Sequence, residues 1–67
     1  MDENLFKLLQ GLLRDLRASV EQIASAVKTE NEEEIVAVAK QIKFNAAAIS
    51  IVAKVSKDEI TEEDEND

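Results

Sequence analysis

Carboxylates are the most frequent side chains in this sequence that could do chemistry. Seven of the last ten residues, 58–67, are Asp or Glu, and the stretch "ENEEE" at 30–34 adds four Glu. Carboxylate oxygens can bind divalent cations, but a calcium-binding loop alternates its oxygen ligands and has a glycine at its turn. The tail "DEITEEDEND" contains no glycine, and we interpret it as a solvated run of like charge.

The acids at 30–34 are explained by the start of a helix. Asn31 and Glu34 have the spacing of a helix cap and its reciprocal partner, and so have Thr29 and Glu32. The three Glu at 32–34 would then face the positive end of the helix dipole. Since this accounts for their position, we predict no metal site there.

Catalytic groups are missing from the sequence. There is no Cys and no His, so the Ser and Thr hydroxyls have no imidazole to activate them. Arg14 and Arg17 lie on one side of a predicted helix, where pairing of Arg17 with Glu21 or contact with a phosphate would account for them. We predict no catalytic, cofactor-binding or metal-binding residues, and we expect that the protein is not an enzyme.

The size and charge of the chain limit its partners. At 67 residues without Cys, it is close to the lower limit for independent folding, and association is the remaining reinforcement. Of 15 acids and 8 bases, seven acids lie in the tail, so residues 1–57 carry eight of each. This neutral body argues against nucleic acid or an anionic membrane as a partner. The N-terminus lacks a basic signal region, and no apolar run reaches about 18 residues, so we expect a cytoplasmic protein without a membrane span.

A first helix is predicted from about residue 2 to 28, with Asp2 as its N-cap. Apolar and small residues recur there in alternating steps of four and three, which is a heptad seam: Leu5, Leu9, Leu12, Leu16, Ser19, Ile23 and Ala26. Four further apolar residues flank this seam at seven-residue intervals: Phe6, Leu13, Val20 and Val27. Such a wide apolar stripe is typical of a helix in a bundle.

A second helix, predicted from about 32 to 57 after a turn at 29–31, has apolar residues on opposite sides. One stripe contains Ile35, Val38, Ala39, Ile42, Ala46, Ile49, Val52 and Ala53. A second set lies roughly opposite and contains Ala37, Phe44, Ala48, Ile51 and Val55. A helix with two apolar faces needs two partners. We therefore predict that one face packs on the first helix, and that the partner-binding residues of the other face are Phe44, Ala48, Ile51 and Val55.

These patterns predict an all-α fold, an antiparallel two-helix hairpin at 1–57 that homodimerises into a four-helix bundle. The predicted main core consists of Leu5, Leu9, Leu12, Leu16, Ile23, Ile35, Ile42 and Ile49. The alternative to a dimer is a fragment whose missing helices complete the bundle. The acidic tail at 58–67 is predicted to be flexible and disordered, although the capping-box spacing of Ser56 and Glu59 would allow a helical turn around Ile60.

The second half of the chain, "KTENEEEIVAVAKQIKFNAAAISIVAKV", resembles helical segments of talin-rod and vinculin-like bundles and of Spa2- and GIT-type scaffold proteins. The likeness is an Asn/Glu turn followed by an Ala/Ile/Val helix with sparse Lys. It covers about half of the chain. The resemblance implies a non-catalytic docking module in the cytoplasm. Bundles of those families have four or five helices in one chain, whereas two are predicted here, which implies a fragment or a dimer.

The sequence thus predicts a non-catalytic protein–protein interaction or dimerisation module of a cytoplasmic scaffold. The face with Phe44 would either form the core of the homodimer or dock another protein through the second helix. A different hypothesis is a small regulatory protein that acts through its acidic tail on a basic partner. In that case deletion of 58–67 would abolish binding, and the binding would depend steeply on salt.

Overall fold

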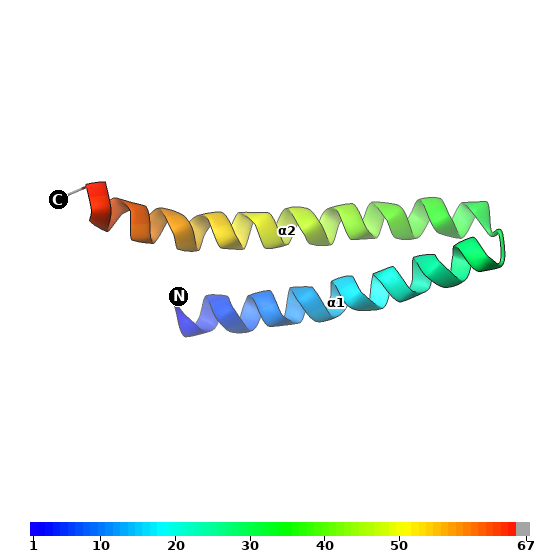
Figure 1. Cartoon of the computed structure of the whole chain (residues 1–67), viewed down its shortest axis with the longest axis horizontal. Helices are drawn as coiled ribbons and strands as arrows, with labels where there is room; N and C mark the ends of the chain where they lie inside the picture. The colour runs from blue at the N-terminus through cyan, green and yellow to red at the C-terminus, as the bar shows by residue number, and fades with distance from the viewer. Residues whose placement is uncertain (66–67) are drawn as a thin grey trace.

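The structure, a computed structural model, describes the backbone of residues 1–65 and the side chains of residues 1–58. This part of the chain is all-helical. It consists of α1 (Glu3–Lys28) and α2 (Glu32–Glu65), which pack against each other as an antiparallel hairpin (Figure 1). The predicted hairpin is confirmed, and the first helix and the start of the second lie within one residue of their predicted positions.

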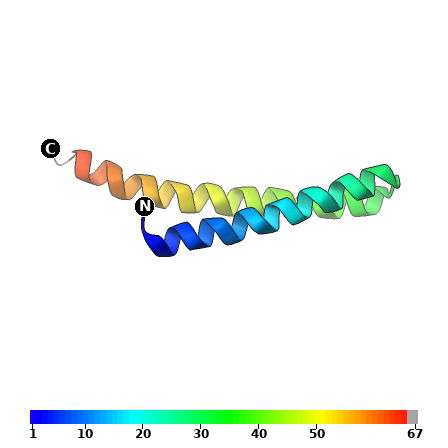
Figure 2. The ribbon, with the colours of Figure 1, turned by 60° about the horizontal axis from the view of Figure 1, so that its bottom comes forward.

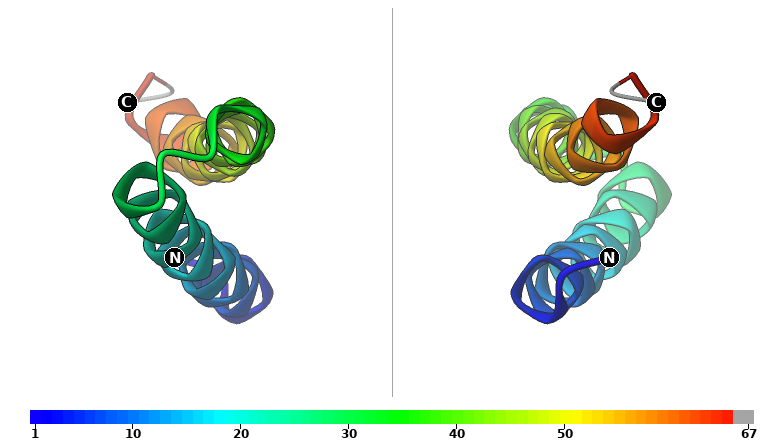
Figure 3. Two further views of the ribbon diagram at one scale, coloured as in Figure 1. Left: turned by 90° about the vertical axis from the view of Figure 1, so that its right-hand side faces the viewer. Right: turned by 90° about the vertical axis from the view of Figure 1, so that its left-hand side faces the viewer.

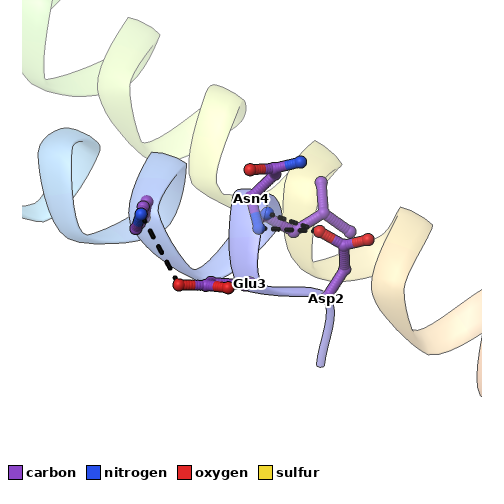
Figure 4. Close-up of polar contacts among 5 residues, drawn as sticks. Asp2, Glu3 and Asn4 are labelled. Carbon is purple, nitrogen blue, oxygen red and sulfur yellow. Dashed lines mark hydrogen bonds and ion pairs between the residues drawn. The ribbon is translucent and has the colours of Figure 1, made fainter.

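The start of α1 is fixed by the predicted N-cap. The Asp2 carboxylate accepts hydrogen bonds from the backbone N–H groups of Asn4, at 2.7 Å, and Leu5, at 3.4 Å (Figure 4). Glu3 adds an acid to the first turn and forms an exposed ion pair with Lys7, with 3.5 Å between Oε1 and Nζ. The Asp2 carboxylate thereby satisfies amide donors that a helix start leaves without partners.

The turn between the helices closes α1 with a Schellman motif. The Asn31 N–H donates to the Ala26 carbonyl at 2.9 Å, and the Glu30 N–H donates to the Val27 carbonyl at 3.1 Å. Glu30 has a φ of 56°, in the left-handed region where glycine is the usual residue. The Thr29 hydroxyl also donates to the Ser25 carbonyl at 3.1 Å. The last turn of α1 is therefore held by side-chain and backbone bonds together.

Asn31 begins α2, as one of the two predicted caps. Its Oδ1 accepts from the Glu34 N–H at 3.2 Å, and its Nδ2 donates to Glu34 Oε2 at 3.3 Å. Thr29, the other candidate, serves the end of α1 instead. Three Glu at 32–34 lie in the first turn of α2, where the helix dipole favours negative charge.

The second helix continues eight residues past its predicted end near 57, to Glu65. The predicted tail at 58–67 therefore has a helical backbone over 58–65, and residues 66–67 lie outside the described part of the chain. No Pro or Gly occurs after Gly11 to stop the helix. Because α2 has 34 residues and α1 has 26, α2 overhangs the N-terminal end of α1 by about 12 Å at 1.5 Å per residue (Figures 1 and 2).

The contact between the helices is narrow. The buried hydrophobic residues of the described part are Ala26, Val38 and Val52, and two serines, Ser19 and Ser56, are buried as well. All eight residues of the predicted main core are half-buried. Three residues of the stripe predicted to face α1 do not do so, because Ala39, Ala46 and Ala53 are exposed. They lie about 100° or more around the helix from Asn45 or Val52, which face α1.

Candidate functional site

The predicted partner-binding face of α2 is exposed over three of its four residues. Phe44 is 79% exposed, Ile51 63% and Val55 46%. Ala48 is half-buried at the edge of the contact with α1. Phe44 also lines a shallow hollow of about 410 Å³ with Lys40, Lys43 and Ala47. The structure thus leaves Phe44, Ile51 and Val55 without cover inside the hairpin, and their role in binding a partner remains a prediction.

Exposed large hydrophobic side chains also occur on α1, which the predicted binding site omits. Four of them recur every seven residues and are between 42% and 57% exposed: Phe6, Leu13, Val20 and Val27. The seven-residue spacing was visible in the sequence as the flank of the seam. A single partner helix cannot cover both the seam and this flank. The sequence did not show that α2 would cover the seam and leave the flank exposed.

A polar hollow lies between the helices on one side of the hairpin. It has a volume of about 520 Å³, and its lining includes Asp15, Ser19, Gln22, Gln41 and Asn45. The Nδ2 atom of Asn45 is buried and has no hydrogen-bond partner among the residues that the structure describes. A buried amide without an acceptor is destabilising. The hollow contains no nucleophile paired with a base, so it offers no route to covalent catalysis.

The remaining charged groups form no chemical site in the described part of the chain. No group of three Asp or Glu side chains is placed there to hold a metal ion. Arg14 and Arg17 line a second hollow on α1 with Gln10 and Leu13, and the ion pair expected between Arg17 and Glu21 is not formed. An exposed pair of this kind contributes little, because water solvates both groups well.

By length and composition alone, α2 could span a membrane. The segment Glu32–Asp58 has a mean hydropathy of 1.5 in its most apolar window. The sequence contains no long uninterrupted apolar run, and therefore no membrane span was expected here. Core helices of soluble proteins meet the same criterion. Lys40 and Lys43 lie inside this segment, and each charged residue costs about 2.5–3.5 kcal/mol near the centre of a bilayer.

The fold and exposed surface place the molecule in the general class of helical hairpins with uncovered apolar faces. No family model, curated protein or solved structure matches the chain. The resemblance to scaffold bundles therefore stays a prediction, and the function has to be argued from the hairpin itself.

Proposed function

We propose that this chain is a non-catalytic protein–protein interaction module, which homodimerises into a four-helix bundle and docks another protein through α2. The observation that supports it most directly is the distribution of large hydrophobic side chains. Ten of them in the described part are more than 40% exposed, whereas three hydrophobic residues are buried. A soluble monomer rarely leaves so many large apolar side chains in water.

The accessible area supports association independently. A folded monomer of 7.4 kDa is expected to expose about 4,200 Å², whereas this chain exposes 5,526 Å². The excess of about 1,300 Å² exceeds the roughly 800 Å² that each partner buries in a standard interface. The shape agrees, since the radius of gyration is 16.0 Å and a compact chain of this length has about 11 Å.

A four-helix bundle is the simplest assembly that removes this excess. Two hairpins packed side by side enclose a continuous core, while one hairpin buries only the stripe along which its two helices touch. In such a dimer the half-buried Leu and Ile of the seam would become fully buried. Burial of a fully exposed Leu or Ile side chain contributes about 1.5–3 kcal/mol to stability. Since these side chains are already half-buried in the hairpin, each would contribute part of that value.

Sedimentation equilibrium of the full chain tests the proposal. We expect a mass of twice 7.4 kDa over the micromolar range. We also expect the far-ultraviolet circular dichroism of a helical protein. A chain that stays monomeric and helical at the highest concentration would contradict self-association, because the exposed surface would then be stable in water.

A second candidate function has one specific observation in its favour, the overhang of α2 beyond α1. It belongs to the segment 58–67, which contains seven acids and no base, and it would be free to bind a basic partner. We expect that deletion of 58–67 leaves the dimer mass unchanged, because the deleted segment lies beyond the N-terminal end of α1. If the regulatory hypothesis holds, the same deletion abolishes binding to a basic partner, and binding by the full chain depends steeply on salt. A dimer that dissociates on deletion would contradict the placement of the acidic segment outside the contact.

A further inference from the structure

The two broad sides of the hairpin differ, and the polar hollow shows which residues belong to each side. Viewed end-on, the two helices lie next to each other, so the hairpin has two broad sides (Figure 3). Asp15 and Gln22 of α1 line the hollow together with Gln41 of α2. These residues therefore share one side of the hairpin, which we call the polar side.

The helical repeat then places the large apolar residues of α1 on the opposite side. Asp15 and Gln22 stand four before and three after Ser19, which is buried in the contact, and so lie about 40–60° to one side of it. Leu16 and Ile23 stand three before and four after Ser19, and so lie the same angle to the other side. Both are half-buried.

The same reasoning applies to α2 around Asn45. Gln41, four residues before it, lines the polar hollow. Ile42 and Ile49, three before and four after Asn45, therefore face the other side, and both are half-buried. We call this surface the apolar side. Its central residues are Leu9, Leu16, Ile23, Ile35, Ile42 and Ile49.

Rows of exposed residues border the apolar side on both helices. On α1 the row is Phe6, Leu13 and Val20, and on α2 it is Ala39, Ala46 and Ala53. Both rows have seven-residue spacing. Since Phe6 and Ala53, Leu13 and Ala46, and Val20 and Ala39 are equidistant from the turn, an antiparallel hairpin places the members of each pair opposite one another. A row of large residues thus faces a row of small ones across the half-buried Leu and Ile of the apolar side.

This surface fits a second copy of itself. Rotation about a two-fold axis parallel to the helices lays the large row of each copy over the alanine row of the other, which satisfies the self-complementarity of a two-fold interface and alternates large with small residues. None of the twelve side chains named for the apolar side is ionisable. This side follows α1 for about 39 Å on a body 18 Å wide, or about 700 Å² for each copy, which lies within the range of standard interfaces.

We propose that a second copy of this chain packs on the apolar side, and that the row of Phe44, Ile51 and Val55 stays outside this contact and is free for a different protein. The inference rests on the proposed self-association and adds which surface forms the contact between the two copies. Phe44 lies toward the polar side of α2, about 60° beyond Gln41. A copy seated on the apolar side leaves it uncovered.

Two matched variants test the assignment by sedimentation equilibrium, Ala46→Glu and Phe44→Glu. They introduce the same residue two positions apart on one helix, and both positions are exposed in the hairpin. We expect Ala46→Glu to raise the dissociation constant about 100-fold or more, because it buries an unpaired charge in the interface. Phe44→Glu should change it less than about threefold, as for a surface residue.

The outcomes separate this inference from the proposed function. A dimer that survives Ala46→Glu, or that Phe44→Glu dissociates, overturns the assignment of the surface and leaves self-association standing. A wild-type chain that is already monomeric contradicts self-association itself.

Disulfide trapping gives a second measurement that does not require a charged variant to fold. The chain has no Cys, so single Leu13→Cys and Ala46→Cys chains can be mixed and oxidised without background. We expect a covalent dimer between the two different variants in higher yield than from either variant alone, because Leu13 of one copy faces Ala46 of the other. Equal or higher yield from either single variant would contradict the proposed packing.

Discussion

The two sides of the hairpin share the same pair of helices and the same heptad spacing, yet they differ in composition. On the apolar side the positions next to the seam are Leu and Ile, and the border is hydrophobic. On the polar side the equivalent positions near the turn are Asp15, Gln22 and Gln41, around an amide that lacks a partner. One pair of helices can therefore present a hydrophobic surface on one side and a polar one on the other, and substitutions at matched positions should affect stability in opposite directions.

The largest effect is expected at Ile42, three residues before Asn45. Ile42→Asn places an amide in the centre of the apolar side, where it finds neither water nor an acceptor once a second copy is bound. We expect a loss of about 3 kcal/mol in the free energy of unfolding, measured by urea denaturation at a fixed chain concentration. A loss below about 0.5 kcal/mol would mean that this side stays in water.

The complementary change on the polar side should have the opposite sign. Asn45→Leu removes a buried Nδ2 that has no described partner and replaces it with a side chain of similar size. We expect a gain of about 1–2 kcal/mol in the free energy of unfolding, with the dimer mass unchanged. A loss of stability would show that Asn45 forms a hydrogen bond in the assembly, for example to a polar group of the second copy.

The smallest effect concerns Gly11, which lies four residues before Asp15 on the outer flank of the polar side. A Cβ built at Gly11 meets nothing within 4 Å, and the residue lies within α1. Gly11→Ala should therefore stabilise the helix by about 1 kcal/mol. Ala46→Gly, at the border of the apolar side, is the matched control, and it should destabilise by more than this because it also removes an interface methyl group.

The sequence predicted the parts of the fold that depend on local chemistry. Asp2 as a cap, the pair of Asn31 and Glu34, and the turn at 29–31 follow from side chains that satisfy nearby backbone groups. The heptad seam of α1 was also visible, because its period requires only counting. These features need no knowledge of what lies across the hairpin.

The exposure of individual residues on α2 could not be predicted in the same way. The apolar residues of this helix cover so wide an arc that several orientations bury a similar area. The sequence alone placed Ala39, Ala46 and Ala53 in the stripe facing α1, while the structure turns Asn45 and Ser56 into that contact. Small alanines gain little by burial, so an orientation that leaves them exposed and buries Val38 and Val52 loses little.

The exposure of the predicted partner-binding residues followed from the sequence in part, and their role in binding stays a prediction. Phe44, Ile51 and Val55 are exposed as expected of a binding face, and Ala48 is half-buried because it borders the seam. The sequence did not predict that Phe6, Leu13 and Val20 on α1 would be exposed. Their seven-residue spacing is the same whether they face a neighbouring helix or water.

The overhang of α2 affects how copies of this elongated hairpin can associate. One end of the 55 Å body presents the Glu-rich turn, and the other presents the acidic extension at 58–65. Rods meeting tip to tip would bring like charges together, which opposes growth into filaments at low salt. Flank-to-flank association along the apolar side involves no such charges within the contact, but the proposed two-fold axis parallel to the helices also sets like tips side by side. The dimer should therefore tighten as salt screens the acids at both tips.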